Sequence, residues 1–353
     1  MQIRHRSREG EPFTLVQYSG RIGDFLVALP YLRKYSEQKN TVFILPKLLM
    51  PIASRALECD IVYYDSSKFS YNFVYRYKVY GELGRYHIAK AVNVCSFSRA
   101  QHLILGTDAK EKICYEGEYI HHYAADPFFD RFYTKIIPNP YASEKSIEHI
   151  SVHNGAICQA LTGEGFRPTA KDYRELMARL TDEKILQQYQ LKKGSYLVFV
   201  TDASTTQKMF PAIFWQKIVD YFTNTHRVVL IGVQQSLIEN SEVVNLTGKT
   251  KLPEAFGVLA NAKAVLSNDT GPAHFAYLSG VPTVCILGGG HFGRFLPWFE
   301  FSDKVECVYH EMECFGCDWK CPYVSNSTEV VPCISSIDAD TVIAKMTQVL
   351  EKV

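Results

Sequence analysis

The sequence lacks several features that would assign it to a simple class. It contains no apolar run of the ~18 residues that a membrane-spanning helix needs. Its net charge is only +1 over 353 residues, which gives no overall field to attract nucleic acid. It has no internal repeat and no low-complexity segment, and its charged N-terminus is unlike a signal peptide. We therefore expect a cytoplasmic globular protein that does not bind nucleic acid.

A small basic cluster near the N-terminus is the exception to this even charge. Arg4, Arg6 and Arg8 lie close together beside His5. Such a cluster could touch an anionic membrane surface. A solvated terminal tail is the simpler interpretation.

The length and the pattern of the chain predict two α/β domains, each with a parallel sheet. Short apolar or β-branched runs alternate with helical patterns, and we expect strands at 13–19, 41–45, 61–64, 88–94, 112–115, 196–200, 228–231, 243–246, 264–267 and 283–287. Residues 62–87 are rich in tyrosine and give no clear pattern. We place the domains at 1–185 and 186–337, followed by a terminal helix in 338–353.

The most informative stretch runs from Ser267 to Val284. It is typical of a strand end, a polar turn, a short helix and a second strand. Asp269-Thr270-Gly271 stand where a parallel strand passes into a helix N-terminus, whose backbone N–H groups and dipole favour an anion. Gly271 lets the backbone approach a ligand, and His274 follows one turn later. Asp269 could be only a helix cap, but the whole stretch favours a diphosphate site.

The same run resembles the donor-binding signature of a known family. From Asn268 to Thr283 it is N-D-T-G-P-A-H-F-A-Y-L-S-G-V-P-T, which is similar to the ADP-heptose:lipopolysaccharide heptosyltransferases of glycosyltransferase family 9. The first domain adds Gly23-Asp24, Pro30 and Leu32-Arg33, which resemble the start of that family. The resemblance covers most of the second domain and residues 1–40, and it says little about residues 60–170.

This resemblance implies a GT-B architecture, in which two Rossmann-like doubly wound domains face a cleft. It also implies that the helix in 338–353 packs back onto the N-terminal domain. The implied activity is inverting transfer of a heptose-like sugar from a nucleotide-sugar donor, with an ADP-sugar favoured, to a hydroxyl of a glycan or glycolipid such as lipopolysaccharide. Contact with the inner membrane would then be peripheral.

Glycosyl transfer needs a base, groups that stabilise the departing diphosphate, and a pocket for the nucleoside. Asp24 is the candidate base, although an aspartate before an apolar helix is also a good N-cap. Lys208 is the candidate partner of the leaving group, because it lies on the loop after the first strand of the second domain. The predicted donor-binding residues are Ser204, Thr205, Lys208, Asp269, Thr270, Gly271 and His274.

No cofactor is expected for catalysis. No Asp-x-Asp pair appears in the context of a metal-dependent transferase, so Lys208 and a helix dipole would replace a divalent ion. The nucleoside is less clearly defined. Gly232 is followed by Val233-Gln234-Gln235-Ser236, and the nearest acid is Glu239, whereas the family often has an acidic residue shortly after this glycine. The loop 288–294 could approach the ligand through Arg294 or could simply form a turn.

Ten cysteines are many for a reducing compartment, and half of them lie near the C-terminal end. Four of these have a spacing that could hold structural zinc or iron: Cys314, Cys317, Cys321 and Cys333. Some relatives that glycosylate bacterial autotransporters carry a cysteine-bound iron in this region. Reduced thiols or disulfides explain the spacing equally well, and four protein ligands would leave no open position for catalysis.

Two other functions remain open at this stage. The chain could transfer its sugar to a protein acceptor, as the autotransporter-modifying relatives do. It could also be a non-catalytic module that binds a sugar nucleotide. An acceptor assay separates the first from glycan transfer, and the second predicts donor binding without transfer or hydrolysis.

Overall fold

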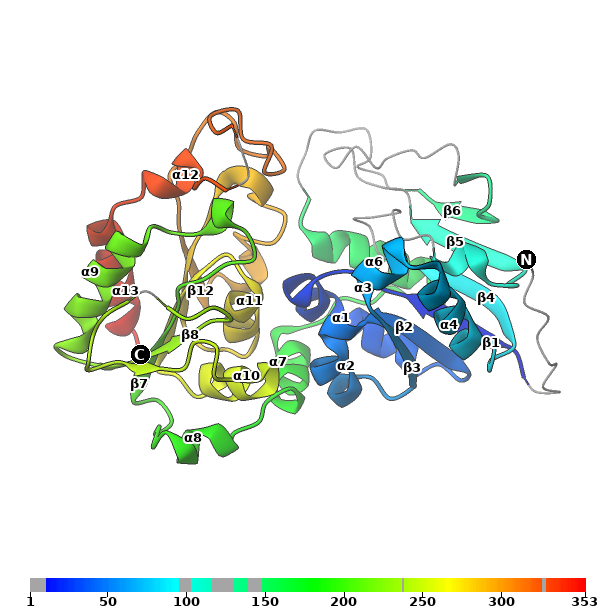
Figure 1. Ribbon diagram of the computed structural model, residues 1–353, viewed down its shortest axis with the longest axis horizontal. Helices are drawn as coiled ribbons and strands as arrows, with labels where there is room; N and C mark the ends of the chain where they lie inside the picture. Colours follow the sequence, from blue (N-terminus) through cyan, green and yellow to red (C-terminus); the bar gives the residue numbers. More distant parts are fainter. Residues whose placement is uncertain (1–10, 95–102, 116–129, 139–147, 237, 326–327) are drawn as a thin grey trace. The chain divides into compact units, whose positions relative to one another are not determined.

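The structure is a computed structural model that describes residues 11–94, 103–115, 130–138, 148–236, 238–325 and 328–353 (Figure 1). The chain divides into two compact units, Met1–Pro168 and Thr169–Val353, and each is described by itself. Each unit is built on a six-stranded sheet of parallel strands. This confirms the predicted α/β class with two Rossmann-like domains. The cleft between the domains stays a prediction.

The first unit has the strand order β3-β2-β1-β4-β5-β6. Its strands are β1 (Phe13–Gln17), β2 (Thr41–Pro46), β3 (Asp60–Tyr64), β4 (Ile88–Asn93), β5 (Glu111–Tyr115) and β6 (Lys135–Ile137). Its helices are α1 (Ile22–Ser36), α2 (Met50–Ala56), α3 (Ser66–Tyr71), α4 (Phe73–Leu83) and α6 (Ile150–Thr162), with 3-10 turns η1 (Lys47–Leu49) and η3 (Leu103–Gly106). The tyrosine-rich stretch 62–87 therefore forms α3 and α4.

The second unit has the strand order β12-β11-β10-β7-β8-β9. Its strands are β7 (Tyr196–Val200), β8 (Arg227–Ile231), β9 (Val244–Asn245), β10 (Ala264–Asn268), β11 (Thr283–Ile286) and β12 (Val305–Val308). Its helices are α7 (Ala170–Arg179), α8 (Lys184–Gln188), α9 (Ala212–Thr223), α10 (Leu252–Ala260), α11 (Gly271–Leu278), α12 (Pro332–Ser335) and α13 (Ala339–Leu350). Its 3-10 turns are η5 (Thr206–Lys208), η6 (Gly289–His291) and η7 (Phe299–Phe301).

Helices cover both faces of the second sheet, which explains why its central strands are buried throughout. Every residue of β7 and of β10 is buried. On one face α9 and α13 lie side by side, with Trp215 and Met346 fully or almost fully buried in one core (Figure 1). On the other face α10 packs against α11, where the rings of Phe256 and Phe275 stack 3.9 Å apart.

The strand order of the second sheet reverses between β7 and β10. From β7 the chain builds outward through β8 to β9, and then returns to place β10 on the opposite side of β7. The loops after β7 and β10 therefore diverge at the carboxyl edge of the sheet. In open parallel sheets this position is the usual ligand crevice.

The division between the units lies before α7, whereas the sequence placed it at residue 185. Helix α7 belongs to the second unit because its apolar face is buried there. The ring of Tyr173 makes edge contacts with Trp298 and Phe301, at centroid distances of 5.6 and 5.5 Å. The charged residues Lys171, Arg174, Glu175 and Arg179 lie on the exposed face of α7.

The terminal helix also differs from its prediction. The resemblance implied that residues 338–353 pack back onto the N-terminal domain. In the structure, the apolar stripe of α13 joins the core of the second unit, with Val342, Met346 and Val349 buried against α9 and the sheet. This stripe covers a face of the second sheet that α9 alone leaves partly open.

Among the described helices, none is long and apolar enough to cross a membrane.

Candidate functional site

The predicted donor-binding residues gather where the strand order of the second sheet reverses. Asp269 follows β10, and Lys208 lies in η5 on the loop after β7. The two side chains form an ion pair, with Lys208 Nζ 3.0 Å from Asp269 Oδ2. Their side chains are only 18% and 6% exposed, respectively. The structure thus joins two residues that are far apart in the sequence into one partly dehydrated charged centre.

His274 completes this centre from the first turns of α11. Its Nε2 lies 3.5 Å from Asp269 Oδ1, and its Nδ1 lies 2.8 Å from the Tyr277 hydroxyl. Burial alone raises the pKa of Asp269. Lys208 and His274 outweigh burial, however, and hold the pKa of that carboxyl well below its usual value. Asp269 is therefore a fixed negative charge that orients the Lys208 ammonium and the His274 ring.

The N-terminus of α11 begins directly after this aspartate. Thr270 is the N-cap residue in an extended conformation, and no side-chain hydrogen bond caps the helix. Gly271 is the first helical residue, and Pro272 follows it. The Thr270 hydroxyl stays on the same turn, 3.3 Å from the Ser267 hydroxyl. The turn therefore places a helix N-terminus and a hydroxyl beside Lys208, an arrangement of the kind that suits an anion.

The other two predicted residues lie on the Lys208 loop. The Thr205 carbonyl accepts a hydrogen bond from the Lys208 N–H at 3.1 Å. Ser204 is exposed on the same loop. Asn268 fixes this loop against β10, because its side-chain amide donates to the Thr201 carbonyl and its oxygen accepts from the Phe210 N–H.

The sequence missed a contribution of the cysteine-rich segment to this site. Lys208 Nζ lies over the ring of Trp319, 4.7 Å from the centroid, and the Gln207 side chain donates to the Trp319 carbonyl at 3.1 Å. A cation over an indole face is attracted to it electrostatically. A single tryptophan among cysteines carries no sequence signal for this contact. Gln207 and Trp319 are 112 positions apart in the sequence.

The glycine-rich loop holds that tryptophan in place. A side chain at Gly290 would collide with the Trp319 indole, so only glycine lets the two segments approach. His291 Nε2 lies 2.9 Å from Asp318 Oδ1. Burial lowers the pKa of His291, and the positive charges of Lys208 and Arg294 lower it further, while Asp318 and Asp269 oppose this shift.

A carboxylate also lies at the end of β8, although the sequence showed none there. Asp202, on the loop after β7, accepts hydrogen bonds through Oδ2 from the N–H groups of Val233 at 2.5 Å and Gln234 at 3.3 Å. A Cβ at Gly232 would lie 2.8 Å from this oxygen, so the glycine makes room for the carboxylate. Asp202 belongs to the loop after the neighbouring strand β7. The residues that follow Gly232 in the sequence therefore did not reveal it.

Asp24, the candidate base, lies in the first unit at the third residue of α1. Its Oδ2 accepts a hydrogen bond from the Arg21 N–H at 2.9 Å, so it does cap this helix. The side chain is only partly buried. A side chain at Gly20 would meet both Asp24 and the Tyr18 hydroxyl, so these two groups flank the same glycine. Its role as a base stays a prediction.

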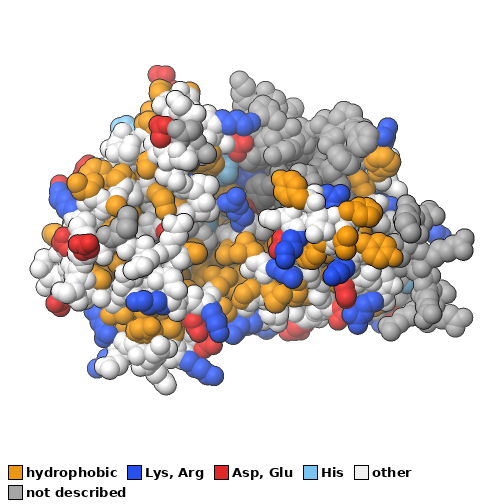
Figure 2. Space-filling model, viewed as in Figure 1, with side chains coloured by type: hydrophobic (Ala, Val, Ile, Leu, Met, Phe, Trp, Pro, Cys, Tyr) orange, Lys and Arg blue, Asp and Glu red, His pale blue; other side chains and the backbone are white. Residues whose placement is uncertain are grey.

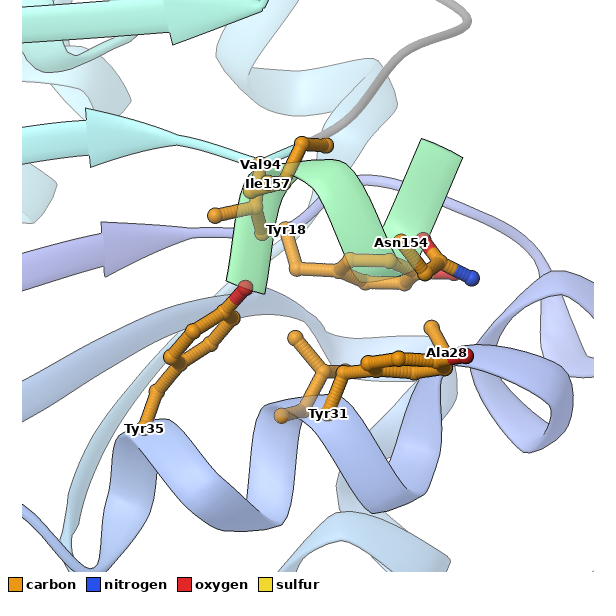
Figure 3. A pocket seen from close by; sticks show the side chains of 8 residues that line it. Tyr18, Ala28, Tyr31, Tyr35, Val94, Asn154 and Ile157 are labelled. Atoms are coloured by element: carbon orange, nitrogen blue, oxygen red, sulfur yellow. The ribbon is translucent and has the colours of Figure 1, made fainter. Parts of the chain in front are cut away.

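A small cavity beside α1 has room for about one water molecule (Figure 3). It is lined by Tyr18, Ala28, Tyr31, Leu32, Tyr35, Val94, Asn154 and Ile157. In Figure 3 the rings of Tyr18 and Tyr31 lie one above the other, with Asn154 beside them. Tyr31 donates to the Ser151 carbonyl at 3.1 Å and so joins α1 to α6. The cavity is too small for a sugar and belongs to the packing of these two helices.

The predicted metal site is not supported. Among the described residues, no group of three or more His, Cys, Asp or Glu side chains is arranged to hold a metal ion. Cys314, Cys317, Cys321 and Cys333 are free thiols. Burial raises the pKa of Cys317, and the other three thiols raise it further. Cys333 Sγ instead accepts a hydrogen bond from the Gly289 N–H at 3.4 Å, which ties it to the glycine-rich loop.

Comparison with known sequences agrees with the site. The family model described as glycosyltransferase family 9 (heptosyltransferase) matches residues 159–321, which include the Lys208 loop and the Asp269 turn. The resemblance to glycosyltransferase family 9 is confirmed. Two Campylobacter jejuni proteins, each named lipooligosaccharide heptosyltransferase 2, are 25% identical over 147 residues and 27% identical over 128 residues. These matches cover 37% and 33% of this chain, and 46% and 40% of the relatives, so the chain spans less than half of either one.

Solved structures of family 9 and its neighbours share the fold along nearly the whole chain. A family 9 glycosyl transferase from Veillonella parvula has a TM-score of 0.70 at 16% identity, covering 97% of this chain and 98% of that one. The ADP-heptose lipopolysaccharide heptosyltransferase II of E. coli has a TM-score of 0.64 at 15% identity, with 96% and 99% covered. The iron-containing dodecameric glycosyltransferase TibC of E. coli has a TM-score of 0.53 at 14% identity, with 97% and 77% covered.

Proposed function

We propose that the chain is an inverting glycosyltransferase that moves a sugar from a nucleoside diphosphate donor to an acceptor hydroxyl. The observation that carries the proposal is the Lys208–Asp269 pair at the N-terminus of α11. A lysine, a histidine and a helix N-terminus at the reversal of a parallel sheet suit a diphosphate. The same residues lie inside the segment that matches family 9.

In the proposed reaction, the acceptor oxygen attacks the anomeric carbon while the bond from that carbon to the diphosphate oxygen breaks. Asp24 takes the proton of the acceptor hydroxyl. Lys208 and the amides at the start of α11 stabilise the negative charge that develops on the diphosphate. A single displacement inverts the anomeric centre. Since a carboxylate is a weak base, the proton is transferred late in the step.

Positive charge from the chain itself makes the proposed reaction independent of a catalytic metal. Lys208 is paired with Asp269 at the start of α11, and Arg294 lies on the glycine-rich loop, where its N–H donates to the His291 carbonyl at 3.0 Å. In this proposal they fill the role that a divalent ion plays elsewhere. The indole of Trp319 keeps the Lys208 ammonium beside Asp269 and directed to the ligand.

For the donor we propose an ADP-sugar, with heptose as the sugar. The curated relatives are named as heptosyltransferases, and a structural neighbour is named for ADP-heptose. Asp202 would accept hydrogen bonds from the ribose hydroxyls, because it lies at the end of β8, where Rossmann-like folds place an acid for that purpose.

For the acceptor we propose a hydroxyl of a lipooligosaccharide or another surface glycolipid, used at the cytoplasmic face of the membrane with peripheral contact. The relatives' names support this acceptor. The basic cluster Arg4, Arg6 and Arg8 lies outside the described residues. Transfer to a protein is less favoured, because the TibC-like match is lower and the cysteine metal site is not supported.

A nucleotide titration followed by thermal unfolding tests the donor assignment. A ligand at about 100 times its dissociation constant stabilises the folded protein by about 2.7 kcal/mol. We expect ADP to stabilise the protein, and UDP, GDP and CDP to do so much less. We also expect 2′-deoxy-ADP to be weaker than ADP, and Asp202→Asn to reduce that difference. Equal effects of all the nucleotides, or none, would contradict the proposed donor.

Replacing Trp319 by leucine tests its proposed role as a positioning residue. Leucine keeps apolar bulk but removes the ring face, so ADP affinity should fall by about 2–5-fold. Trp319→Phe should retain most of the affinity, because a ring remains below the ammonium. Calorimetric titration of both variants makes the comparison. If the leucine and phenylalanine variants bind ADP equally well, the ring face does not position Lys208.

A further inference from the structure

The two helices that the sequence left unassigned carry an exposed aromatic surface. On α3 and α4, the side chains of Tyr71, Phe73, Val74 and Tyr77 are 92%, 78%, 65% and 54% exposed. Figure 2 shows apolar side chains gathered over these helices with Lys and Arg side chains between them. Large apolar groups that are exposed as a cluster mark an interaction surface more often than single ones do.

This exposure is not a consequence of poor packing of the two helices. Their opposite sides are buried in the core of the first unit through Phe69, Val79 and Leu83. Both helices also begin at capping side chains: Asp65 accepts from the Lys68 N–H and Asn72 accepts from the Tyr75 N–H, each at 2.9 Å. The helices are therefore fixed by one face, and they present the aromatic face to the outside.

The charge of this surface is mainly positive. Between residues 66 and 85 there are four basic residues and one acidic residue, Glu82, whose carboxylate pairs with Arg85 at 3.1 Å. Arg76 is turned back onto α3, where its guanidinium lies over the Phe69 ring and donates to the Phe69 carbonyl at 2.5 Å. Lys68 and Lys78 are exposed beside the aromatic side chains. The surface thus combines tyrosine and phenylalanine with an excess of basic side chains.

We propose that this α3–α4 surface, made of Lys68, Tyr71, Phe73, Val74, Tyr77 and Lys78, docks on a bilayer with anionic headgroups. Tyrosine and phenylalanine favour the boundary between headgroups and acyl chains, and lysines are attracted to anionic lipids. Helices of 6 and 11 residues lie on a bilayer rather than cross it. The proposal rests on the proposed function in one respect: a glycolipid acceptor would be reached from the same bilayer.

A second copy of the chain fits this surface less well. In a two-fold contact the same patch faces itself, so Lys68 and Lys78 would meet lysines of the other copy, and the one acid of these two helices, Glu82, is already paired with Arg85. An anionic lipid surface instead supplies the opposite charge. The charge therefore favours a lipid partner over self-association.

Vesicle flotation with the full chain tests the proposal. The wild type should float with vesicles of phosphatidylcholine and phosphatidylglycerol, less at high salt, and hardly with phosphatidylcholine alone. Phe73→Ser combined with Tyr77→Ser should weaken binding by about tenfold or more. Lys68→Glu combined with Lys78→Glu should abolish the preference for the anionic lipid. Ile213→Ser, at a 75% exposed side chain of α9, is the control and should float as the wild type does.

Other results would overturn the proposal. These are no flotation of the wild type, equal flotation of all variants, or an oligomer of the wild type that the Phe73 and Tyr77 changes dissociate. The last result would assign the surface to a second copy. ADP affinity of the same variants should be unchanged. If the wild type does not bind ADP, the proposed function is refuted. The flotation result would then still test the lipid-binding surface independently.

Discussion

Asp24→Asn is expected to lower kcat by about 10²–10⁴-fold while the protein folds and binds ADP normally. The amide oxygen of asparagine can still accept the hydrogen bond from the Arg21 N–H, so the start of α1 keeps its cap. The amide cannot take a proton from an acceptor hydroxyl. Steady-state transfer kinetics together with ADP titration separate these two properties.

Asp172→Asn is a matched control for this experiment. Asp172 occupies the same third helical position in α7, where it accepts from the Thr169 N–H at 2.7 Å. It lies outside the proposed machinery. If Asp24→Asn and Asp172→Asn both keep near-normal turnover, Asp24 is only a helix cap and the base must be another group.

Lys208→Met should weaken ADP binding by about 30-fold or more, because the methionine removes a charge-assisted contact to the diphosphate. It should also destabilise the free protein by about 3 kcal/mol, since the buried Asp269 carboxylate loses its cationic partner. Denaturant unfolding and ADP titration measure the two effects. A variant that binds ADP as tightly as the wild type would contradict the assigned diphosphate site.

The control for Lys208→Met is Lys217→Met in the same unit. Lys217 pairs with Asp340 at 2.6 Å, but these side chains are 54% and 73% exposed. Surface pairs contribute about 0–1 kcal/mol, so this variant should remain close to the wild type in stability and in ADP affinity.

The pH dependence of the Lys208→Met effect has a definite sign. In the wild type the pKa of Asp269 is lowered, so its contribution to stability is complete above about pH 4 and is lost as the pH falls below that. Without Lys208, burial is less opposed and the pKa of Asp269 rises. The difference in unfolding free energy between the two proteins should therefore shrink on acidification. A difference that grows at low pH would contradict the ion-pair interpretation.

Local patterns predicted the sheets well, because parallel strands that are buried on both faces are short, continuous apolar runs. The run 196–200 is β7 without change, and 264–267 differs from β10 by one residue. Residues 62–87 could not be assigned, because the apolar side chains of α3 and α4 lie on exposed as well as buried faces. The partner of α13 was predicted wrongly, since an apolar stripe does not identify the surface that it covers.

The site shows the same limit. Asp269 and Lys208 could be selected because they follow β10 and β7, two neighbouring parallel strands whose carboxyl ends lie at the same edge of the sheet. Trp319 and Asp202 could not be selected, because each contacts a segment that is distant in the sequence and no local pattern indicates that contact. The cysteine spacing left a metal site and free thiols equally open, because spacing alone does not distinguish a ligand set from thiols that pack around a glycine-rich loop; the described residues do not support the metal.

The measurement that tests the central claim most directly is the release of ADP from ADP-heptose, with and without a lipooligosaccharide acceptor. We predict that the wild type releases ADP only when the acceptor is present, with one heptose transferred per ADP and the anomeric configuration inverted. Release that is independent of the acceptor, or binding of ADP-heptose with neither transfer nor hydrolysis, would contradict the assignment as a transferase.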